Sequence, residues 1–263
     1  DDNNNQDGKR ETSVKVKLLA DGSDVADSEV TLNADNNWTN TWNDIPLKSG
    51  GKDITYTVEE TSNVPGYKAE VTGDVKTGFT VTNSHTPETI DIDGIKTWND
   101  ANDQDGKRPG KITVNLLANG VKVADKEVTA ANGWKYSFTD LPKYAGGNEI
   151  TYGITENAVE DYQTLVNGYD ITNSYTPGKT SVSVTKTWDD ANNQDRKRPE
   201  SITVNLLADG QLYKTKTVTA EEDWKYSFKD LPKYSGGNKI IYTITEDAVG
   251  DYATVIDGYN ITN

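Results

Sequence analysis

Apolar and polar residues alternate along much of the chain, which is the pattern of a β-strand with one buried face. In the stretch SVSVTKTWDD, residues 181–190, Val182, Val184 and Trp188 occupy alternate positions. The alternation recurs in two further stretches, Ile202, Val204 and Leu206, and Trp224, Tyr226 and Phe228. No part of the chain has a convincing helical period. The pattern therefore predicts an all-β protein.

Short Asp-Gly or Asn-Gly pairs lie between the predicted strands. Such pairs favour the tight turns of β-hairpins, because both residues adopt positive φ angles at low cost. About seven short strands in each 90 residues indicate an antiparallel β-sandwich. The predicted hairpin turns are Asp21-Gly22, Asn119-Gly120 and Asp209-Gly210.

The chain contains three copies of one unit of about 90 residues, a size at which a domain can fold alone. KTWNDANDQDGKRPGKITVNLLANG (96–120) returns as KTWDDANNQDRKRPESITVNLLADG (186–210), and WKYSFTDLPKYAGGNEITYGITE (134–156) returns as WKYSFKDLPKYSGGNKIIYTITE (224–246). A more diverged copy opens the chain but lacks the first strand. The linkers SHTPET and SYTPGKT favour extended joints. We expect three tandem domains, at residues 1–85, 86–176 and 177–263.

Composition narrows the classes of function. A formal net charge of -15 makes nucleic acid an unsuitable partner. The absence of cysteine removes disulfides, thiolate metal sites and thiol nucleophiles. No stretch approaches the roughly 20 apolar residues of a membrane helix, so no membrane insertion is expected. No signal-peptide pattern opens the chain, so we expect an interior piece of a longer protein.

Three kinds of polar residue fall on the apolar face of the pattern. Lys186 is in phase with Val182 and Val184, although a buried charge or unpaired amide is costly unless it is neutralised or hydrogen-bonded. A core of this size accommodates three such residues only if they meet. The residues in phase with the core are the lysines Lys96 and Lys186, the glutamates Glu60, Glu156 and Glu246, and the asparagines Asn83, Asn173 and Asn263.

A lysine, a glutamate and an asparagine that meet in a core can react. Desolvation favours a neutral amine beside a protonated acid. The amine is a nucleophile, the asparagine carbonyl is an electrophile, and the acid can polarise that carbonyl and pass its proton to departing ammonia. The product is a Lys–Asn isopeptide bond. The alternative is that the lysine and asparagine reach the rim of the sandwich, with the glutamate as an ordinary ion-pair partner.

The motifs KTWDDANNQDRKRP, YTITE and a terminal ITN resemble the Cna B-type domain family, and the resemblance covers all three units. It implies an inverse immunoglobulin-like β-sandwich in which a lysine on the first strand bonds to an asparagine or aspartate on the last, helped by a glutamate. The matching crosslink residues are Lys96 with Asn173 and Lys186 with Asn263, and the matching proton-relay residues are Glu156 and Glu246. The first unit keeps Glu60 and Asn83 without a matching lysine.

The resemblance implies a structural stalk on a Gram-positive cell surface, which projects a ligand-binding head. The expected location is extracellular, with cell-wall anchoring through a region absent from this chain. Collagen binding is expected from a separate region, also absent here, and no partner is required beyond neighbouring domains of the same adhesin. The alternative is a ligand-binding module that contacts host matrix directly.

Two other classes of function have weaker support. The runs NNNQDG and ANDQDG resemble the start of an EF-hand loop, but Val14 and Ile112 stand where the bidentate glutamate is expected, and Arg196 replaces the loop glycine in the third copy. We expect no metal and no cofactor. An enzyme is not expected either, because the chain has one histidine, His85, and a Lys–Glu–Asn triad would react once without turnover.

Overall fold

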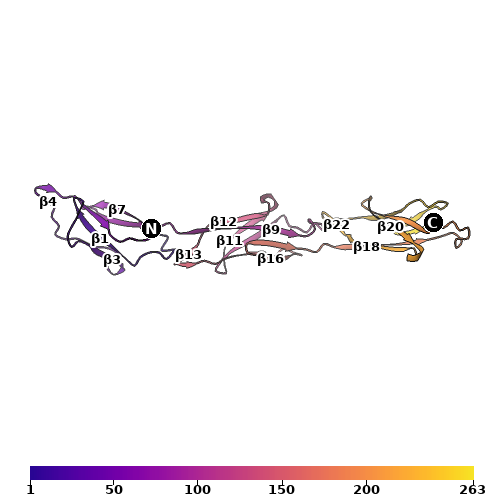
Figure 1. The fold of residues 1–263 in the computed structure, drawn as a ribbon, viewed down its shortest axis with the longest axis horizontal. Helices are drawn as coiled ribbons and strands as arrows, with labels where there is room; N and C mark the ends of the chain where they lie inside the picture. The colour runs from indigo at the N-terminus through magenta and orange to yellow at the C-terminus, as the bar shows by residue number, and fades with distance from the viewer. The chain divides into compact units, whose positions relative to one another are not determined.

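The computed structural model describes all residues, 1–263, and confirms an all-β fold. Its elements are 26 strands and three single-turn 3₁₀ helices (Figure 1). We call residues 1–85, 86–176 and 177–263 the first, second and third repeats. The chain divides into two compact units, of which the first comprises Asp1–Asp93, Leu116–Ala124 and Tyr136–Gly153, and the second Gly94–Asn115, Asp125–Lys135 and Ile154–Asn263.

The third repeat is a sandwich of two main sheets. One sheet has the order β21-β18-β26-β25, and the other has the order β20-β19-β24. Its strands are β18 (Lys179–Thr187), β19 (Ser201–Ala208), β20 (Gln211–Thr219), β21 (Lys225–Pro232), β22 (Tyr234–Ser235), β23 (Asn238–Lys239), β24 (Tyr242–Glu246), β25 (Val255–Asp257) and β26 (Asn260–Thr262), with η3 at Ala220–Glu222. The two sheets enclose the core, which contains Val182, Val184, Ile202, Val204, Leu206, Val218, Phe228, Leu231, Tyr242, Ile244 and Ile261.

One strand pair departs from the antiparallel expectation. The pairings of β18 with β21, β19 with β20 and β24, and β25 with β26 are antiparallel, whereas β18 and β26 run parallel. Parallel neighbours need a long connection. Here almost the whole repeat supplies it, because β18 is the first strand and β26 the last. The parallel pair places the two ends of the repeat side by side.

The second repeat has the same strand order. Its sheets are β12-β9-β17-β16 and β11-β10-β15, and β9 and β17 again run parallel. Its strands are β9 (Thr89–Asn99), β10 (Lys111–Ala118), β11 (Val121–Thr129), β12 (Lys135–Pro142), β13 (Tyr144–Ala145), β14 (Asn148–Glu149), β15 (Tyr152–Glu156), β16 (Gln163–Asn167) and β17 (Asp170–Ser174), with η2 at Ala130–Asn132.

The first repeat keeps one sheet and reduces the other. Strand β1 pairs with β2, β3 and β6, while β7 and β8 form a separate hairpin. Residues 38–46 match β21 in sequence but form no strand. The strands are β1 (Ser13–Ala20), β2 (Ser23–Asp24), β3 (Val30–Asn33), β4 (Lys48–Ser49), β5 (Lys52–Asp53), β6 (Tyr56–Glu60), β7 (Lys68–Asp74) and β8 (Gly78–Ser84), with η1 at Ala34–Asn36.

The predicted hairpin turns are confirmed. Asp209 and Gly210 join β19 to β20 with φ angles of 46° and 79°. Two consecutive positive φ angles are characteristic of a type I′ turn, whose twist matches that of the strands. Asp21-Gly22 and Asn119-Gly120 have the same signs of φ. No helix in the chain is long and apolar enough to cross a membrane.

Candidate functional site

In the third repeat, Lys186 lies on β18, and Asn263 directly follows β26, the neighbouring parallel strand. Lys186 on β18 pairs with Ile261 on β26, and Asn263 follows two residues later. Because side chains alternate along a strand, Asn263 and Ile261 point to the same face, which is the core face. Lys186 is 4% exposed and Asn263 is 6% exposed. Neither residue reaches the rim of the sandwich, contrary to the alternative interpretation of the sequence.

Glu246 approaches the lysine from the opposite sheet. It ends β24 and pairs with Val204 on β19. Its Oε1 lies 3.4 Å from Lys186 Nζ, and both side chains are 0% exposed. The glutamate therefore meets the lysine across the interior of the sandwich.

The second repeat has the same arrangement. Lys96 on β9 pairs with Ile171 on β17, so Asn173 again lies two residues further along the neighbouring strand. Lys96 Nζ lies 3.0 Å from Glu156 Oε1, and both side chains are 0% exposed. Asn173 is also fully buried.

These two sites contain almost all of the buried side-chain polar atoms that lack a hydrogen-bond partner. In the second repeat the unpartnered atoms include Lys96 Nζ, Glu156 Oε1 and both polar atoms of Asn173. The lysine and glutamate are close enough to attract each other, but their atoms do not have hydrogen-bond geometry. Native cores rarely leave polar atoms unpaired, and exceptions require an explanation such as a reactive role. The indole Nε1 atoms of Trp98 and Trp188, whose rings lie beside the two lysines, are also unpartnered, and elsewhere the only such atoms are Asp7 Oδ1 and Asn115 Oδ1.

A tryptophan covers each lysine. The Nζ of Lys96 lies 4.2 Å from the ring centroid of Trp98, and Lys186 has the same distance to Trp188. Burial lowers the pKa of both lysines from the usual value, although the neighbouring glutamates oppose this shift. The site therefore favours an uncharged amine more than water does.

A threonine that sequence reasoning missed holds the second oxygen of each glutamate. Thr164 donates a hydrogen bond of 2.8 Å to Glu156 Oε2, and Thr254 donates one of 2.9 Å to Glu246 Oε2. Both bonds leave Oε1 directed at the lysine. The sequence signal was the same spacing, eight residues, from glutamate to threonine in both repeats.

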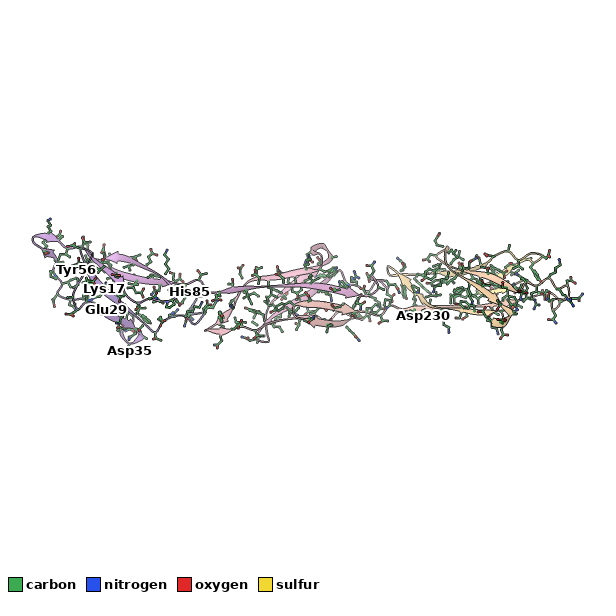
Figure 2. The ribbon with its side chains drawn as sticks, viewed as in Figure 1. Lys17, Glu29, Asp35, Tyr56, His85 and Asp230 are labelled. Atoms are coloured by element: carbon green, nitrogen blue, oxygen red, sulfur yellow. The ribbon has the colours of Figure 1, made fainter.

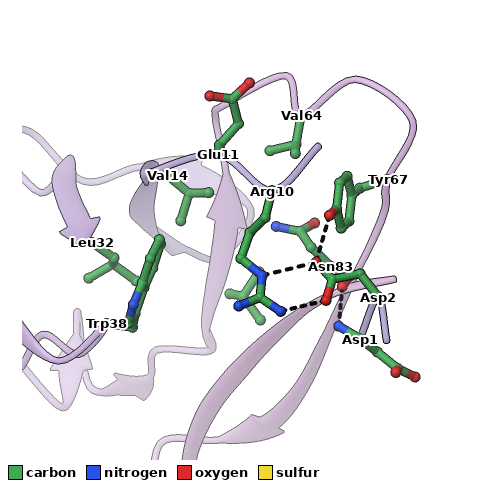
Figure 3. A pocket seen from close by; sticks show the side chains of 11 residues that line it. Asp1, Asp2, Arg10, Glu11, Val14, Leu32, Trp38, Val64, Tyr67 and Asn83 are labelled. Atoms are coloured by element: carbon green, nitrogen blue, oxygen red, sulfur yellow. Dashed lines mark hydrogen bonds and ion pairs between the residues drawn. The ribbon is translucent and has the colours of Figure 1, made fainter. Parts of the chain in front are cut away.

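The first repeat shows the site without a lysine. Asn83 Nδ2 donates a hydrogen bond of 2.9 Å to Glu60 Oε1. The N-terminal amine of Asp1 donates to the backbone carbonyl of Asn83, so the chain start lies beside β8 (Figure 3). A pocket of about 310 Å³, lined by residues that include Asn83, Val81 and Val14, lies on this side of the repeat.

A recurring Asp–Arg–Tyr cluster fixes the Asp/Asn-rich loop of each repeat. In the second repeat, Asp100 accepts hydrogen bonds from Arg108 Nε at 3.0 Å, Tyr162 Oη at 2.9 Å and the backbone N–H of Asp103 at 2.9 Å. Burial raises the pKa of Asp100, but these donors outweigh it and hold the pKa below its usual value. Equivalent clusters are Asp2, Arg10 and Tyr67 (Figure 3), and Asp190, Arg198 and Tyr252.

This cluster was not predicted, although its recurrence at matched positions was visible in the sequence. The cluster weighs against the calcium hypothesis, because the first carboxylate of the loop already accepts hydrogen bonds from an arginine and a tyrosine. No group of three or more His, Asp or Glu residues in the chain has the arrangement of a metal site.

Known proteins share this sequence and fold. The family profile described as Cna protein B-type domain matches residues 1–84, 92–174 and 182–263. A collagen adhesin of Staphylococcus aureus is 40% identical over an alignment of 360 residues, which covers all of this chain and 30% of the relative's length. The crystal structure of two B repeat units (B1B2) of the collagen binding protein of Staphylococcus aureus is 46% identical, with a TM-score of 0.64 over 100% of this chain and 71% of that one.

The family match accounts for almost the whole chain. It also confirms the tandem β-sandwich repeats that the sequence predicts. The chain belongs to the family of Cna B-type domains.

Proposed function

We propose that this chain is a structural stalk segment of a Gram-positive surface adhesin, and that a Lys–Asn isopeptide bond locks each complete repeat. The observation that carries the proposal is the pair of buried sites in which a lysine lies beside a glutamate, a buried asparagine lies on or directly after the neighbouring parallel strand, and polar atoms of all three residues are unpaired. The relatives named as collagen adhesin and collagen binding protein support a surface location. The anchor and the collagen-binding region would belong to other parts of such an adhesin.

The reaction begins with a proton transfer inside the buried pair. The ammonium of Lys96 passes a proton to Glu156, which yields a neutral amine and a neutral acid in a site without water access. The amine nitrogen then attacks Cγ of Asn173, and the acid gives its proton to Oδ1 as the tetrahedral intermediate forms. The lysine nitrogen carries the proton that must leave next.

The second half of the reaction releases ammonia. Glu156 carries the proton from the lysine nitrogen to Nδ2 of Asn173, the Cγ–Nδ2 bond breaks, and the proton on Oδ1 returns to Glu156 while the carbonyl reforms. One Nζ–Cγ bond has formed, one Cγ–Nδ2 bond has broken, and one ammonia has left. The glutamate ends as the neutral acid, with the proton that the lysine ammonium gave up, and the lysine and asparagine are consumed. The event is therefore a single maturation step and not enzymatic turnover.

The bond suits a stalk because of its position. It joins the first and last strands of a repeat, so tension applied through the two ends passes across it. It closes a loop of about 77 residues, which by the chain-entropy argument for crosslinks stabilises the repeat by roughly 4–5 kcal/mol. Mechanical and proteolytic resistance would follow, because the closed segment cannot extend.

The intact mass of the denatured chain tests the bond. The proposal expects a mass lower than the sequence value by two ammonias, about 17 Da each, one for each complete repeat. Glu156→Ala and Glu246→Ala should each restore one ammonia, and the double variant should have the full mass. An unmodified mass for the parent chain would leave both lysines as buried ion-pair partners and would refute the lock.

A direct role in ligand binding is the second candidate. Its test is the binding of the purified chain to immobilised collagen and other matrix proteins. Saturable binding that is lost on mutation of an exposed aromatic residue, such as Tyr213 or Trp38, would favour it over the stalk. No binding, together with the two-ammonia mass loss, is the result that the stalk proposal expects.

A further inference from the structure

A loop of one repeat docks on a hairpin of the next at two places in the chain. In the first joint, the backbone N–H of Gly147 donates to the carbonyl of Gln6 at 3.1 Å. In the second joint, the N–H of Gly237 donates to the carbonyl of Gln104, also at 3.1 Å. Each joint lies within one compact unit. The donors belong to Gly-Gly turns, and the acceptors begin a Gln-Asp-Gly loop, residues 6–8 and 104–106.

The glycine of the loop permits this contact. A Cβ atom on Gly8 would lie 2.5 Å from Gly147 Cα, and one on Gly106 would lie 2.5 Å from Gly237 Cα. Carbon atoms without a bond between them need about 3.5 Å or more. Since the neighbouring atoms are backbone, no side-chain rotation can relieve the overlap. Any other residue at this position would push the two repeats apart.

The aspartate of the loop fixes the linker in the first joint. Asp7 Oδ2 accepts hydrogen bonds of 2.9 Å from the backbone N–H of Glu88 and from Nε2 of His85, which lies where the chain leaves the first repeat (Figure 2). The side chain of Asp7 is 0% exposed. The contact therefore orders both the loop and the linker.

The second joint uses the equivalent aspartate in the same way. Asp105 Oδ2 accepts a hydrogen bond of 2.8 Å from the backbone N–H of Gly178 and one of 2.9 Å from the hydroxyl of Tyr175. The two joints thus make the same contacts from the loop to the hairpin and the linker, although their linker side chains differ. The glutamine supplies a carbonyl, the aspartate holds the linker, and the glycine allows close approach.

The third repeat has the same loop conformation with a different residue at the glycine position. Arg196 has a φ of 55°, close to the 66° of Gly106. Its N–H donates to the carbonyl of Asn193 at 3.0 Å, as that of Gly106 does to Asp103. The loop backbone therefore has the shape for docking, but Arg196 adds the Cβ that the two joints exclude.

The first repeat presents a hairpin of the docking shape. Gly50 and Gly51 have φ angles of 55° and 81°, against 57° and 80° for Gly146 and Gly147. A Cβ on Gly50 or Gly51 would meet no atom within 4 Å, so the outer side of this turn is accessible. The hairpin, β4–β5, is already formed without a docked loop.

We propose that the Gly-Gly hairpin is a docking site for the Gln-Asp-Gly loop of a preceding B-type repeat, and that the loop glycine decides whether two repeats lock together. The hairpin at Gly50-Gly51 is then an acceptor for a repeat of this kind. Arg196 makes the loop of the third repeat, Gln-Asp-Arg, unable to dock on a Gly-Gly hairpin. The sequence of one loop position thus sets which joints of a stalk are stiff and which are free.

The first experiment copies the arginine into an existing joint. In the full chain, Gly106→Arg should speed hydrogen exchange at the amide of Gly237 by about fivefold or more, because that amide loses its acceptor. The amide of Gly147 in the first joint should not change. Gly110→Arg is the matched control, since it adds the same side chain nearby where a Cβ meets nothing within 4 Å. Unchanged protection of Gly237 in Gly106→Arg would overturn the proposal.

The second experiment adds a joint and does not depend on a disruptive variant. A copy of residues 174–263 is joined after Asn263, so that a fourth repeat follows the third. One spin label is placed on a cysteine that replaces Lys197 in the original third repeat, and the other on a cysteine that replaces Asn238 in the copy. The chain has no cysteine of its own. The distance distribution should be broad with Arg196 and narrow with Arg196→Gly. A reference chain labelled at positions 107 and 238 gives the width of a docked joint. Equal widths with Arg196 and Arg196→Gly would refute the role of the loop glycine.

Discussion

The side-chain amide of Asn83 donates a hydrogen bond of 2.9 Å to Glu60, a bond that the equivalent asparagines do not make in the complete repeats. Where a lysine is present, the glutamate Oε1 lies near the lysine Nζ, and the asparagine amide is left without a partner. In the two repeats that contain the lysine, the polar atoms of the asparagine have no hydrogen-bond partner, whereas Asn83 is paired with Glu60.

Removing one reactant should unlock one repeat only. For Asn173→Ala we expect a mass loss of one ammonia instead of two, and a second repeat that is less stable by roughly 4–5 kcal/mol through the lost crosslink. Intact mass and thermal unfolding measure the two effects. Asn83→Ala is the control, because no lysine faces Asn83 and its mass should keep the two-ammonia loss. A two-ammonia loss in Asn173→Ala would show that another residue supplies the electrophile.

The threonine that holds the glutamate should set the rate of bond formation. In Thr164→Val, Glu156 Oε2 loses its hydrogen-bond donor, so the carboxyl group is free to turn away from Lys96. We expect slower ammonia loss in the second repeat, by about tenfold or less, and an unchanged final mass. Thr164→Ser keeps the hydroxyl and should react at the parent rate. The time course of intact mass after refolding distinguishes these outcomes, and equal rates for valine and serine would exclude a positioning role.

The Asp–Arg–Tyr cluster should carry much of the loop's stability. Arg108→Ala leaves the carboxylate of Asp100, whose side chain is 1% exposed, without its main partner. The expected cost is about 3 kcal/mol, the usual range for breaking a buried pair. Denaturant unfolding measures it. Arg108→Ala combined with Asp100→Asn should recover part of the loss, because the uncompensated charge is gone.

Because of the same cluster, we expect the free energy of unfolding to fall in acid. Since the folded-state pKa of Asp100 lies below its usual value, its contribution is fully present above the unfolded-state pKa of about 3.9 and is lost as pH falls through the folded-state pKa. The unfolding free energy of the parent chain should therefore fall below pH 4. The Asp100→Asn variant should show a smaller slope in that range.

The first joint should weaken as pH rises. His85 Nδ1 faces the carbonyl of Gly66 and Nε2 faces Asp7, both at 2.9 Å, and only the protonated ring can donate to both of these acceptors. The hydrogen bond to Asp7 raises the pKa of His85 above its usual value, although burial and Lys9 oppose this. The stabilisation is complete below pH 6.5 and is lost as pH rises through the raised pKa.

The single histidine allows a direct measurement. The titration of His85 by NMR should have a midpoint above 6.5, and Asp7→Asn should lower it. The protection factor of the Gly147 amide, which corrects for the intrinsic rise of exchange with pH, should fall over the same pH range. The protection factor of Gly237 should not change, because Tyr175 replaces the histidine in the second joint. A midpoint at or below 6.5 would contradict the ion pair.

The sequence by itself determined the all-β class, the repeats and the buried positions of Lys186, Glu246 and Asn263. Period-two alternation assigns each side chain to one face, and a duplicated sequence repeats that assignment, so these features follow from local pattern. The hairpin turn at Asp209-Gly210 was visible for the same reason, since two residues decide it.

Only the tertiary structure decided which strands became neighbours. The parallel pairing of β18 with β26, the threonine on Glu246 Oε2 and the contact of Gly106 with Gly237 join residues far apart in the chain. Alternation gives the face of a side chain but not its register or its partner on another strand. The register and the partner depend on how the two sheets pack. The free energy of that packing is set by the whole repeat and not by any short segment.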